Sequence, residues 1–433
     1  MKQTIITITI IALFPFYLSA QQQNNNVYRF TLNECIDFAF RNSYNRQSMK
    51  LSEEAKEASY KYSKHERIPT VSASLSESFS NSNSTGFAWG GSIGLNANWL
   101  ITQGGSINNS IKQSKLQMEQ ASYQTSQYDN ELTIGILQAF LTVLGNEELL
   151  KVQESLLTAS EEQLEQGKVK YSVGQILESD YLMLHAQYAI DKNNIVDTRI
   201  GRDNSLMTLK ILLSLDPLAE LEIIYPDTSA LDAMAILPSA QEVLDQAINT
   251  LPNLKISQYN IDIAKIGVKL SQSSYYPSLS LGASIGTGHT DFNNFGTQLS
   301  DRLNEQLGLS LSIPIYSKSK TKASIVQSKI ALQQAELDQR QTELNIRQTV
   351  VQEYQNVTSA YSKYEASTIK ENAYQKTFEA YRVQFEAGAI TAVDLLQQQN
   401  NYISALNEYI HSKYGFMLKR KILDIYMGIP VTM

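Results

Sequence analysis

The sequence predicts an α+β membrane protein built from two tandem repeats, each with the order helix, strand, strand, long helix, helix. Three observations lead to this prediction. The chain aligns with itself over most of its length, strand-like segments occur at matching points of the two copies, and each pair of strands is followed by a very long helical stretch. These observations predict that the chain consists of two copies of one structural unit.

The repeat is seen when the sequence is shifted against itself by 214 positions. Gly94 then falls on Gly308, and Gly174 falls on Gly388, without a gap between them. Upstream of the strands the offset is 208, so the second copy carries six extra residues near 290–301. These offsets predict three parts of the chain: a first repeat over 30–217, a connector over 218–237 and a second repeat over 238–430.

Residues 1–20 have the layout of a secretory signal peptide. Lys2 precedes a mostly apolar run from Ile5 to Leu18, and Ser19 and Ala20 precede a polar Gln/Asn tract. No later stretch reaches the about 18 apolar residues that a membrane-spanning helix needs. We therefore expect an exported protein without an inner-membrane span.

Composition excludes several classes of function. A formal charge of −7 argues against nucleic acid as a partner, and four scattered histidines show no metal-ligand spacing. The single cysteine, Cys35, cannot form an intramolecular disulfide. The sequence also lacks a nucleophile elbow and a phosphate-binding glycine loop. We expect no metal, no cofactor and no enzymatic activity.

Alternation of apolar residues with small or polar ones predicts two strands in each repeat. The predicted strands cover about 70–80, 87–101, 278–288 and 305–315. Strands of about 9 to 11 residues are long enough to cross a bilayer at a tilt. Trp89 and Trp99 lie at opposite ends of one strand on its apolar face, so we expect membrane-interface anchors, with ordinary strand packing as the alternative.

Each strand pair is followed by a predicted helix hairpin, over about 105–216 and about 318–428. The outbound helices would be about 100 Å long. Seven-residue seams run along them, and one in the second repeat consists of Val350, Val357, Tyr364, Glu371, Phe378 and Phe385. The return helix of the first repeat is expected to pack through Leu182, Ala189 and Val196.

Four strands cannot close a membrane barrel, because the smallest such barrels use about eight. An open edge in lipid would leave backbone groups unpaired at a cost of several kcal/mol each. Closure must therefore involve further copies of the chain. Three copies would give twelve strands, and the strand count alone also permits a dimer.

The order of elements and the turns between the long helices resemble the TolC-like outer-membrane efflux protein family, the outer-membrane factors of tripartite efflux and type I secretion systems. The sharpest match is a turn motif with an aromatic residue, a glycine three positions later and an aspartate six positions after that. It occurs twice, as Tyr171, Gly174 and Asp180 and as Phe385, Gly388 and Asp394. The resemblance covers nearly all of the chain after the signal peptide.

The resemblance implies a homotrimer in the outer membrane of a Gram-negative-type bacterium. Its 12-stranded β-barrel would be continuous with a long periplasmic α-helical barrel, and the connector would lie at the equator. Expected partners are outer-membrane lipid, a periplasmic adaptor protein and an inner-membrane transporter. The sequence does not identify the exported substrate, whose choice would rest mainly with that transporter.

The resemblance also places the tip turns at Gly174 and Gly388 at a periplasmic aperture. Asp394 would belong to an acidic ring, and Asp180 to a link between hairpins, with Tyr171 close by. A simpler interpretation is that the glycines only permit tight turns and that the aspartates only stabilise helix N-termini.

The sequence departs from the family's best-known gate. Phe385 replaces a tyrosine, Ile390 stands where an arginine would pair with acids, and Gln397 replaces a second aspartate of the ring. We therefore expect apolar packing around Phe385 and Ile390 to carry more of the closure.

The predicted function is that of a channel-tunnel subunit, a passive duct that is gated at its periplasmic tip. The alternative is a secreted coiled-coil scaffold or adhesin without a channel. A scaffold explains the seams but leaves the bilayer-length strands without a purpose.

Overall fold

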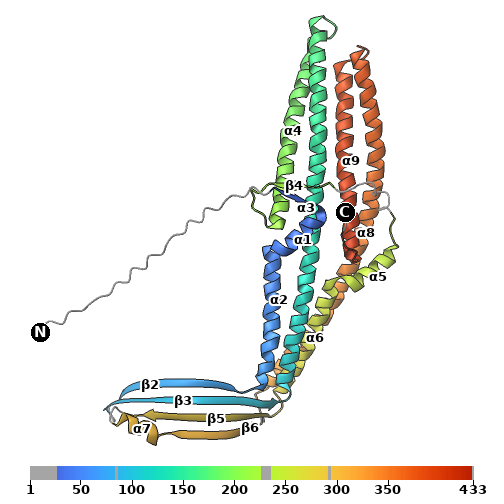
Figure 1. Cartoon of the computed structure of the whole chain (residues 1–433). Helices are drawn as coiled ribbons and strands as arrows, with labels where there is room; N and C mark the ends of the chain where they lie inside the picture. Colours follow the sequence, from blue (N-terminus) through green and yellow to red (C-terminus); the bar gives the residue numbers. More distant parts are fainter. Residues whose placement is uncertain (1–26, 83–85, 226–235, 291–293, 432–433) are drawn as a thin grey trace, which may run out of the picture.

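The structure, a computed structural model, describes residues 27–82, 86–225, 236–290 and 294–431. The chain is elongated, with two helix hairpins at one end and a four-stranded sheet at the other (Figure 1). Between them lies a waist, where the chain's C-terminal end and a short two-stranded sheet are found.

Apart from β1, η1, β4 and α7, the elements follow the same order in both halves of the chain. The first half contains β1 (Tyr28–Phe30), α1 (Leu32–Asn42), α2 (Tyr44–Ser63), the 3-10 helix η1 (Lys64–Arg67), β2 (Thr70–Ser82), β3 (Gly86–Gln103), α3 (Ser106–Ser172), α4 (Glu178–Leu213) and β4 (Leu221–Ile223). The second half contains α5 (Ala240–Thr250), α6 (Pro252–Ser273), β5 (Ser278–His289), α7 (Phe295–Asp301), β6 (Asn304–Ser312), α8 (Lys320–Glu386) and α9 (Ala392–Tyr426).

The helical stretch before each strand pair is divided into two helices rather than being continuous. Ser43 has an extended backbone, and its hydroxyl accepts a hydrogen bond from the Arg46 amide, so it ends α1 and caps α2. In the second half Pro252 takes the first position of α6, where its missing N–H costs nothing. Each break turns the chain from the waist toward the sheet (Figure 1).

The large sheet is antiparallel with the strand order β2, β3, β5, β6. Its register places Leu75 opposite Ile93, and Leu281 opposite both Trp99 and Leu309, so the apolar residues share one face. Serine, glycine and asparagine occupy the other face. Most of the apolar face is bare within this chain, since Leu75 is 73% and Leu307 is 75% exposed.

The last strand, β6, ends at Ser312, whereas the sequence predicts strand to about residue 315. Pro314 has no N–H to donate to a neighbouring strand, which accounts for the earlier end. Lys318 and Ser319 then take left-handed backbone conformations before α8 begins.

The main core lies at the waist, where the long helices pack on the short elements. Phe140 of α3, Val357 of α8 and Phe416 of α9 are fully buried there. The parallel pair β1 and β4 adds Leu221 and Ile223 to the same core. The strand β4 falls within the predicted connector, of which residues 226–235 lie outside the described part of the chain.

The predicted seam of α8 is buried against α9. Val350, Val357, Phe378 and Phe385 are buried, and the Phe378 ring stacks on Tyr402 with centroids 5.8 Å apart. The predicted seam of α4 does not pack within this chain, because Leu182 and Val196 are at least half exposed. The buried face of α4 passes instead through Leu184, Gln187, Asp191 and Ile195.

The six extra residues of the second copy coincide with α7, a helix that the sequence pattern did not predict. Seven residues are too few for a readable helical period. The helix folds back on β5, where the Thr287 hydroxyl donates to the Leu299 carbonyl at 2.5 Å. No helix among the described residues is both long enough and apolar enough to cross a membrane.

Replacing Phe140 by alanine tests the waist core. We expect the free energy of unfolding to fall by about 3 to 5 kcal/mol, because a fully buried ring leaves a cavity. Chemical denaturation followed by circular dichroism measures the change. Val173→Ala, at an exposed position, is the control and is expected to have little effect. Equal destabilisation by both changes would contradict the assignment of the core.

Candidate aperture at the hairpin tips

Both long hairpins end in the same kind of turn. Gly174 and Gly388 each have a φ of +74°, a left-handed conformation that glycine adopts without strain. In the first turn the amides of Gly174 and Gln175 donate to the carbonyls of Tyr171 and Lys170 at 3.0 and 2.8 Å. These two bonds make a Schellman motif, which satisfies the last carbonyls of α3.

The second turn repeats this motif. The Gly388 amide donates to Phe385 at 3.0 Å, and the Ala389 amide donates to Gln384 at 2.9 Å. A side chain at either glycine would find open space, so the backbone conformation is what requires glycine. The turn is therefore set by local chemistry that the sequence carries in both copies.

The second tip also begins its return helix with a capping box. The Thr391 hydroxyl donates to the Asp394 carboxylate at 2.7 Å, and the Asp394 amide donates back to that hydroxyl at 3.3 Å. The hydrogen bonds that the Thr391 hydroxyl and the Thr391 backbone amide donate to the Asp394 carboxylate lower the pKa of Asp394, whose side chain is exposed. The carboxylate is held in its ionised form at the N-terminus of α9.

Asp180 occupies the matching position in the first turn of α4, but no threonine precedes it there. Leu177, the residue before α4, makes no side-chain cap. The two aspartates that the repeat aligns therefore have different surroundings. Only Asp394 is part of a capping box.

Lys170, which the sequence analysis did not single out, joins the two tips. Its ammonium group donates to the carbonyls of Phe385 and Glu386 at 2.5 and 3.0 Å. These carbonyls lie at the C-terminus of α8, where the helix dipole favours a cation. The ammonium also lies 4.6 Å from the centroid of the Phe385 ring. One side chain of the first hairpin thus binds the end of the second.

An apolar cluster lies directly below this link. Phe385 is only 2% exposed and packs with Leu184, Phe378 and Leu395, while Ile390 covers the cluster as a partly buried residue. Tyr171, which the repeat aligns with Phe385, is exposed and stacks on Tyr181 with ring centroids 5.5 Å apart. Phe385 therefore joins the two hairpins, and Tyr171 does not.

The predicted tip residues are therefore mostly brought together. A cleft between the two tips is lined by Lys170, Asp180, Phe385, Gly388, Ile390 and Asp394. Tyr171 lies outside this cleft, stacked on its own hairpin.

The two tryptophans belong to the opposite end of the molecule (Figure 1). Trp99 is half-buried where β3 meets the helices, and its indole nitrogen donates to the Arg67 carbonyl at 2.9 Å. Trp89 lies near the distal end of the same strand and stacks on Phe79.

A second polar link between the hairpins lies deeper, at Asp191 of α4. This carboxylate is fully buried and accepts hydrogen bonds from Gln187 at 2.8 Å and from Gln399 of α9 at 3.2 Å. Burial raises the pKa of Asp191, and hydrogen bonds from Gln187, Ser160 and Gln399 lower it by less. No sequence pattern marks this residue, because its partner comes from the other repeat.

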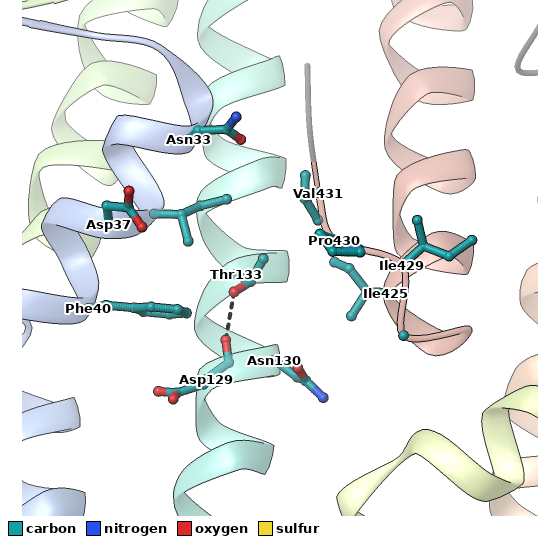
Figure 2. A pocket seen from close by; sticks show the side chains of 12 residues that line it. Asn33, Asp37, Phe40, Asp129, Asn130, Thr133, Ile425, Ile429, Pro430 and Val431 are labelled. Carbon is teal, nitrogen blue, oxygen red and sulfur yellow. Dashed lines mark hydrogen bonds between the residues drawn. The ribbon is translucent and has the colours of Figure 1, made fainter.

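A different cleft opens at the waist, between α1, α3 and the last residues of the chain (Figure 2). Asp37 and Asp129 face Ile425 and Pro430 across it. Asp129 is already paired with Arg46, whose guanidinium nitrogens lie 2.7 and 3.1 Å from its carboxylate oxygens. The Asp129 carboxylate that lines this cleft is thus already engaged in a structural ion pair. Among the described residues no cluster of histidine, cysteine or acidic side chains fits a metal ion.

Comparison with known families bears directly on this architecture. A model of the outer membrane efflux protein family matches residues 36–214 and 243–417, which together make up most of the chain. The chain belongs to this family. The resemblance seen in the sequence is thereby confirmed, and the family is one of channel proteins with no catalytic member indicated.

Two relatives in the family illustrate the similarity. The chain is 25% identical to the outer membrane protein TolC of Escherichia coli over 224 residues, 49% of this chain and 43% of TolC. It is 23% identical to the alkaline protease secretion protein AprF of Pseudomonas aeruginosa over 302 residues, 69% of this chain and 62% of AprF. In both cases the matched stretch spans less than two thirds of the relative.

The fold is similar to that of the Campylobacter jejuni CmeC outer membrane channel. The TM-score is 0.74 at 16% identity, over 92% of this chain and 85% of CmeC. At this identity the likeness shows the fold of the efflux family, in which helices predominate and strands are few.

Replacing Lys170 by methionine tests the link between the tips. We expect the contact to weaken by about 1 to 2 kcal/mol, because two hydrogen bonds to helix-end carbonyls are lost while the aliphatic stem is kept. Spin labels at Ser172 and Ala387 report the distance between tips by pulsed electron resonance. Burial, with a smaller contribution from Glu34, raises the pKa of Cys35 to about 12, so this thiol does not compete for the label.

The expected result is a broader distance distribution in Lys170→Met. Lys168→Met, at an exposed position of the same helix, is the control and should leave the distribution unchanged. Identical distributions in both variants and the parent protein would show that Lys170 does not join the hairpins.

Asp191 predicts a pH dependence of stability. Its pKa in the folded chain is raised above the ordinary value of 3.8, so folding favours the protonated form. This contribution to stability is fully present below the ordinary pKa and is lost as the pH rises through the raised folded value. Asp191→Asn should therefore gain stability relative to the parent protein as the pH rises.

Urea denaturation of both proteins across acidic and neutral pH measures this difference. Asp245→Asn removes an exposed carboxylate and is the matched control. If the difference between Asp191→Asn and the parent protein does not change with pH, the buried carboxylate does not titrate as expected.

Proposed function

We propose that the chain is one subunit of an outer-membrane channel-tunnel, a passive duct that carries substrates from the periplasm or an inner-membrane pump to the exterior. The observation that carries this proposal is the four-stranded sheet with a mostly bare apolar face and two open edges.

The sheet needs partners on both sides. Among the described strands β2 pairs only with β3, and β6 pairs only with β5, so each has an outer edge of unpaired backbone groups. Antiparallel pairing of β6 with β2 of a second copy would satisfy both edges. Three copies make a closed 12-stranded β-barrel with the apolar face toward lipid and the serine-rich face toward water.

The helices extend the same wall. They pack in the row α2, α3, α6, α8, which leaves α2 and α8 at the two sides of the subunit. The outer side of α8 carries an exposed seven-residue seam of Ile330, Leu337, Leu344 and Val351. In a homotrimer this seam meets α2 of the next subunit, and the helices form a long periplasmic barrel. Two tandem repeats over 30–217 and 238–430 account for the shared element order.

The tips form the gate in this proposal. Gly174 and Gly388 turn the hairpins at the aperture, with Asp180, Asp394 and Tyr171 around it. Three copies of Asp394 make an acidic ring that selects cations. Within one chain, hydrogen bonds from Thr391 lower the pKa of Asp394. Phe385 and Ile390 supply the apolar packing that holds the hairpins together.

Trp89 and Trp99 mark the two membrane interfaces of the barrel, and the waist with β1 and β4 is equatorial. The partners are outer-membrane lipid, a periplasmic adaptor protein and an inner-membrane transporter, as expected for the efflux family. A secreted coiled-coil scaffold is the competing function. It gives no role to the bare apolar sheet, and it would be recovered in the soluble fraction rather than in extracted outer membranes.

Reconstitution into a planar lipid bilayer tests the duct and its gate. We expect discrete conductance steps from the parent protein. The double variant Phe385→Ala with Ile390→Ala should show larger or more frequent openings, because it removes the buried ring and the residue covering it. Ile369→Ala, an exposed apolar truncation far from the tip, is the control.

The conductance of the parent protein tests the channel, and that of the double variant tests the role of apolar packing in closure. Absence of any conductance in the parent protein would end the channel proposal. Unchanged conductance in the double variant would leave the channel in place and remove the role of apolar packing in closure.

A further inference from the structure

The small helix α7 lies on the apolar face of the sheet. Thr287 and His289 of β5 belong to that face, since the register pairs them with Ile93 and Gly91 of β3. Both residues hold α7: the Thr287 hydroxyl donates to Leu299, and the His289 ring lies 4.9 Å from the ring of Phe295. The helix is thus docked on the face opposite the serines.

A His–Glu pair lies beside α7 on this apolar face. His289 is only 5% exposed, and its Nε2 atom lies 3.0 Å from a carboxylate oxygen of Glu77 on β2. The carboxylate crosses β3 at Gly91, where a Cβ atom would approach it to 2.3 Å. Glycine at this position therefore leaves the space through which the Glu77 side chain of β2 reaches His289 of β5.

Aromatic rings continue this contact across the distal end of the sheet. The centroid of the Trp89 ring lies 4.1 Å from that of His289 and 6.0 Å from that of Phe79. The Phe79 and Phe87 ring centroids are 6.2 Å apart. Phe79, Phe87 and Phe295 are 65%, 72% and 43% exposed. Such a band of amphipathic and apolar rings suits the boundary between headgroups and acyl chains.

The spacing along β3 agrees with this placement. Ten residues separate Trp89 from Trp99, about 33 Å along a strand. At the usual tilt of a barrel strand this is about 25 Å of height, the thickness of the apolar band of an outer-membrane barrel. A carboxylate near the distal end is tolerated there, whereas it would be costly at the midplane.

We propose that α7 is a membrane-interface clasp, docked outside the pore on the lipid-facing side of the sheet. Phe295, which like Trp89 contacts the His289 ring, lies at the headgroup boundary of the bilayer, and the Glu77–His289 pair keeps the helix docked. The helix α7 is thereby held away from the pore mouth. This inference rests on the proposed function, because it requires the apolar face of the sheet to contact lipid.

Trypsin cleavage at Arg302 measures whether α7 is docked. Arg302 is the only lysine or arginine between Lys269 and Lys318, so the cut is identified unambiguously by mass spectrometry. In lipid nanodiscs we expect His289→Ala to be cleaved there about tenfold faster than the parent protein, because the pair that restrains α7 is lost. Phe295→Ala, which truncates an exposed ring, should act in the same direction and does not disturb the sheet.

The control is His185→Ala, which removes an exposed histidine from α4. Circular dichroism confirms that each variant keeps its helical content. Equal cleavage rates at Arg302 in His289→Ala, Phe295→Ala and the parent protein would overturn the clasp.

Lipid contact is measured separately. In Trp99→Phe, Trp89 is the sole tryptophan, and its fluorescence should be quenched more by lipid brominated near the headgroup than by lipid brominated near the chain end. Quenching with unchanged cleavage rates rejects the clasp and leaves the channel standing. Absence of quenching by either lipid rejects the lipid-facing sheet and, with it, the proposed function.

Discussion

The unpaired edges of the four-stranded sheet are the constraint on which the rest of the molecule depends. A strand edge in a bilayer has no water to satisfy its N–H and C=O groups, so its cost must be removed by pairing. β2 and β6 lie at opposite sides of the sheet, and every strand between them is antiparallel to its neighbours. In the proposed channel, the arrangement of edges, rather than any single side chain, makes the subunit incomplete by itself.

The two copies of the sequence pattern have different surroundings at the hairpin tips. Tyr171 and Phe385 occupy equivalent positions, but the first is exposed and the second is buried between hairpins. The residue aligned with Lys170 is Gln384. The Gln384 carbonyl accepts a hydrogen bond within its own turn. The Lys170 side chain, in contrast, donates across the hairpins to the carbonyls of Phe385 and Glu386. Contacts between the repeats are therefore asymmetric even where the turns themselves are alike.

Features governed by local chemistry were readable from the sequence. The tip turns follow from glycines that must adopt positive φ, and the strands follow from alternation that also placed Trp89 and Trp99 on one face. The capping box of Thr391 and Asp394 had a visible signal in its spacing, although the aspartate alone was singled out. Local rules of this kind do not depend on what packs nearby.

The residues that sequence reasoning missed depend on contacts between distant segments. Lys170 finds its acceptors in the other hairpin, and Asp191 is bound by Gln399 from the second repeat. The face of α4 that is buried within this chain was missed for the same reason, since a helix with two partly apolar faces does not reveal which one meets α9. β6 ended early at a proline whose effect on strand pairing could have been anticipated.

The long helices cross the waist without interruption, and this has a mechanical consequence. From Val357 in the waist core to the end of α8 at Glu386 the rod extends about 45 Å. A tilt of about 5° at the waist would displace the tip by about 4 Å. The packing of side chains such as Phe140 and Phe416 therefore sets the angle of the hairpins at the waist, and substitutions there would move the hairpin tips.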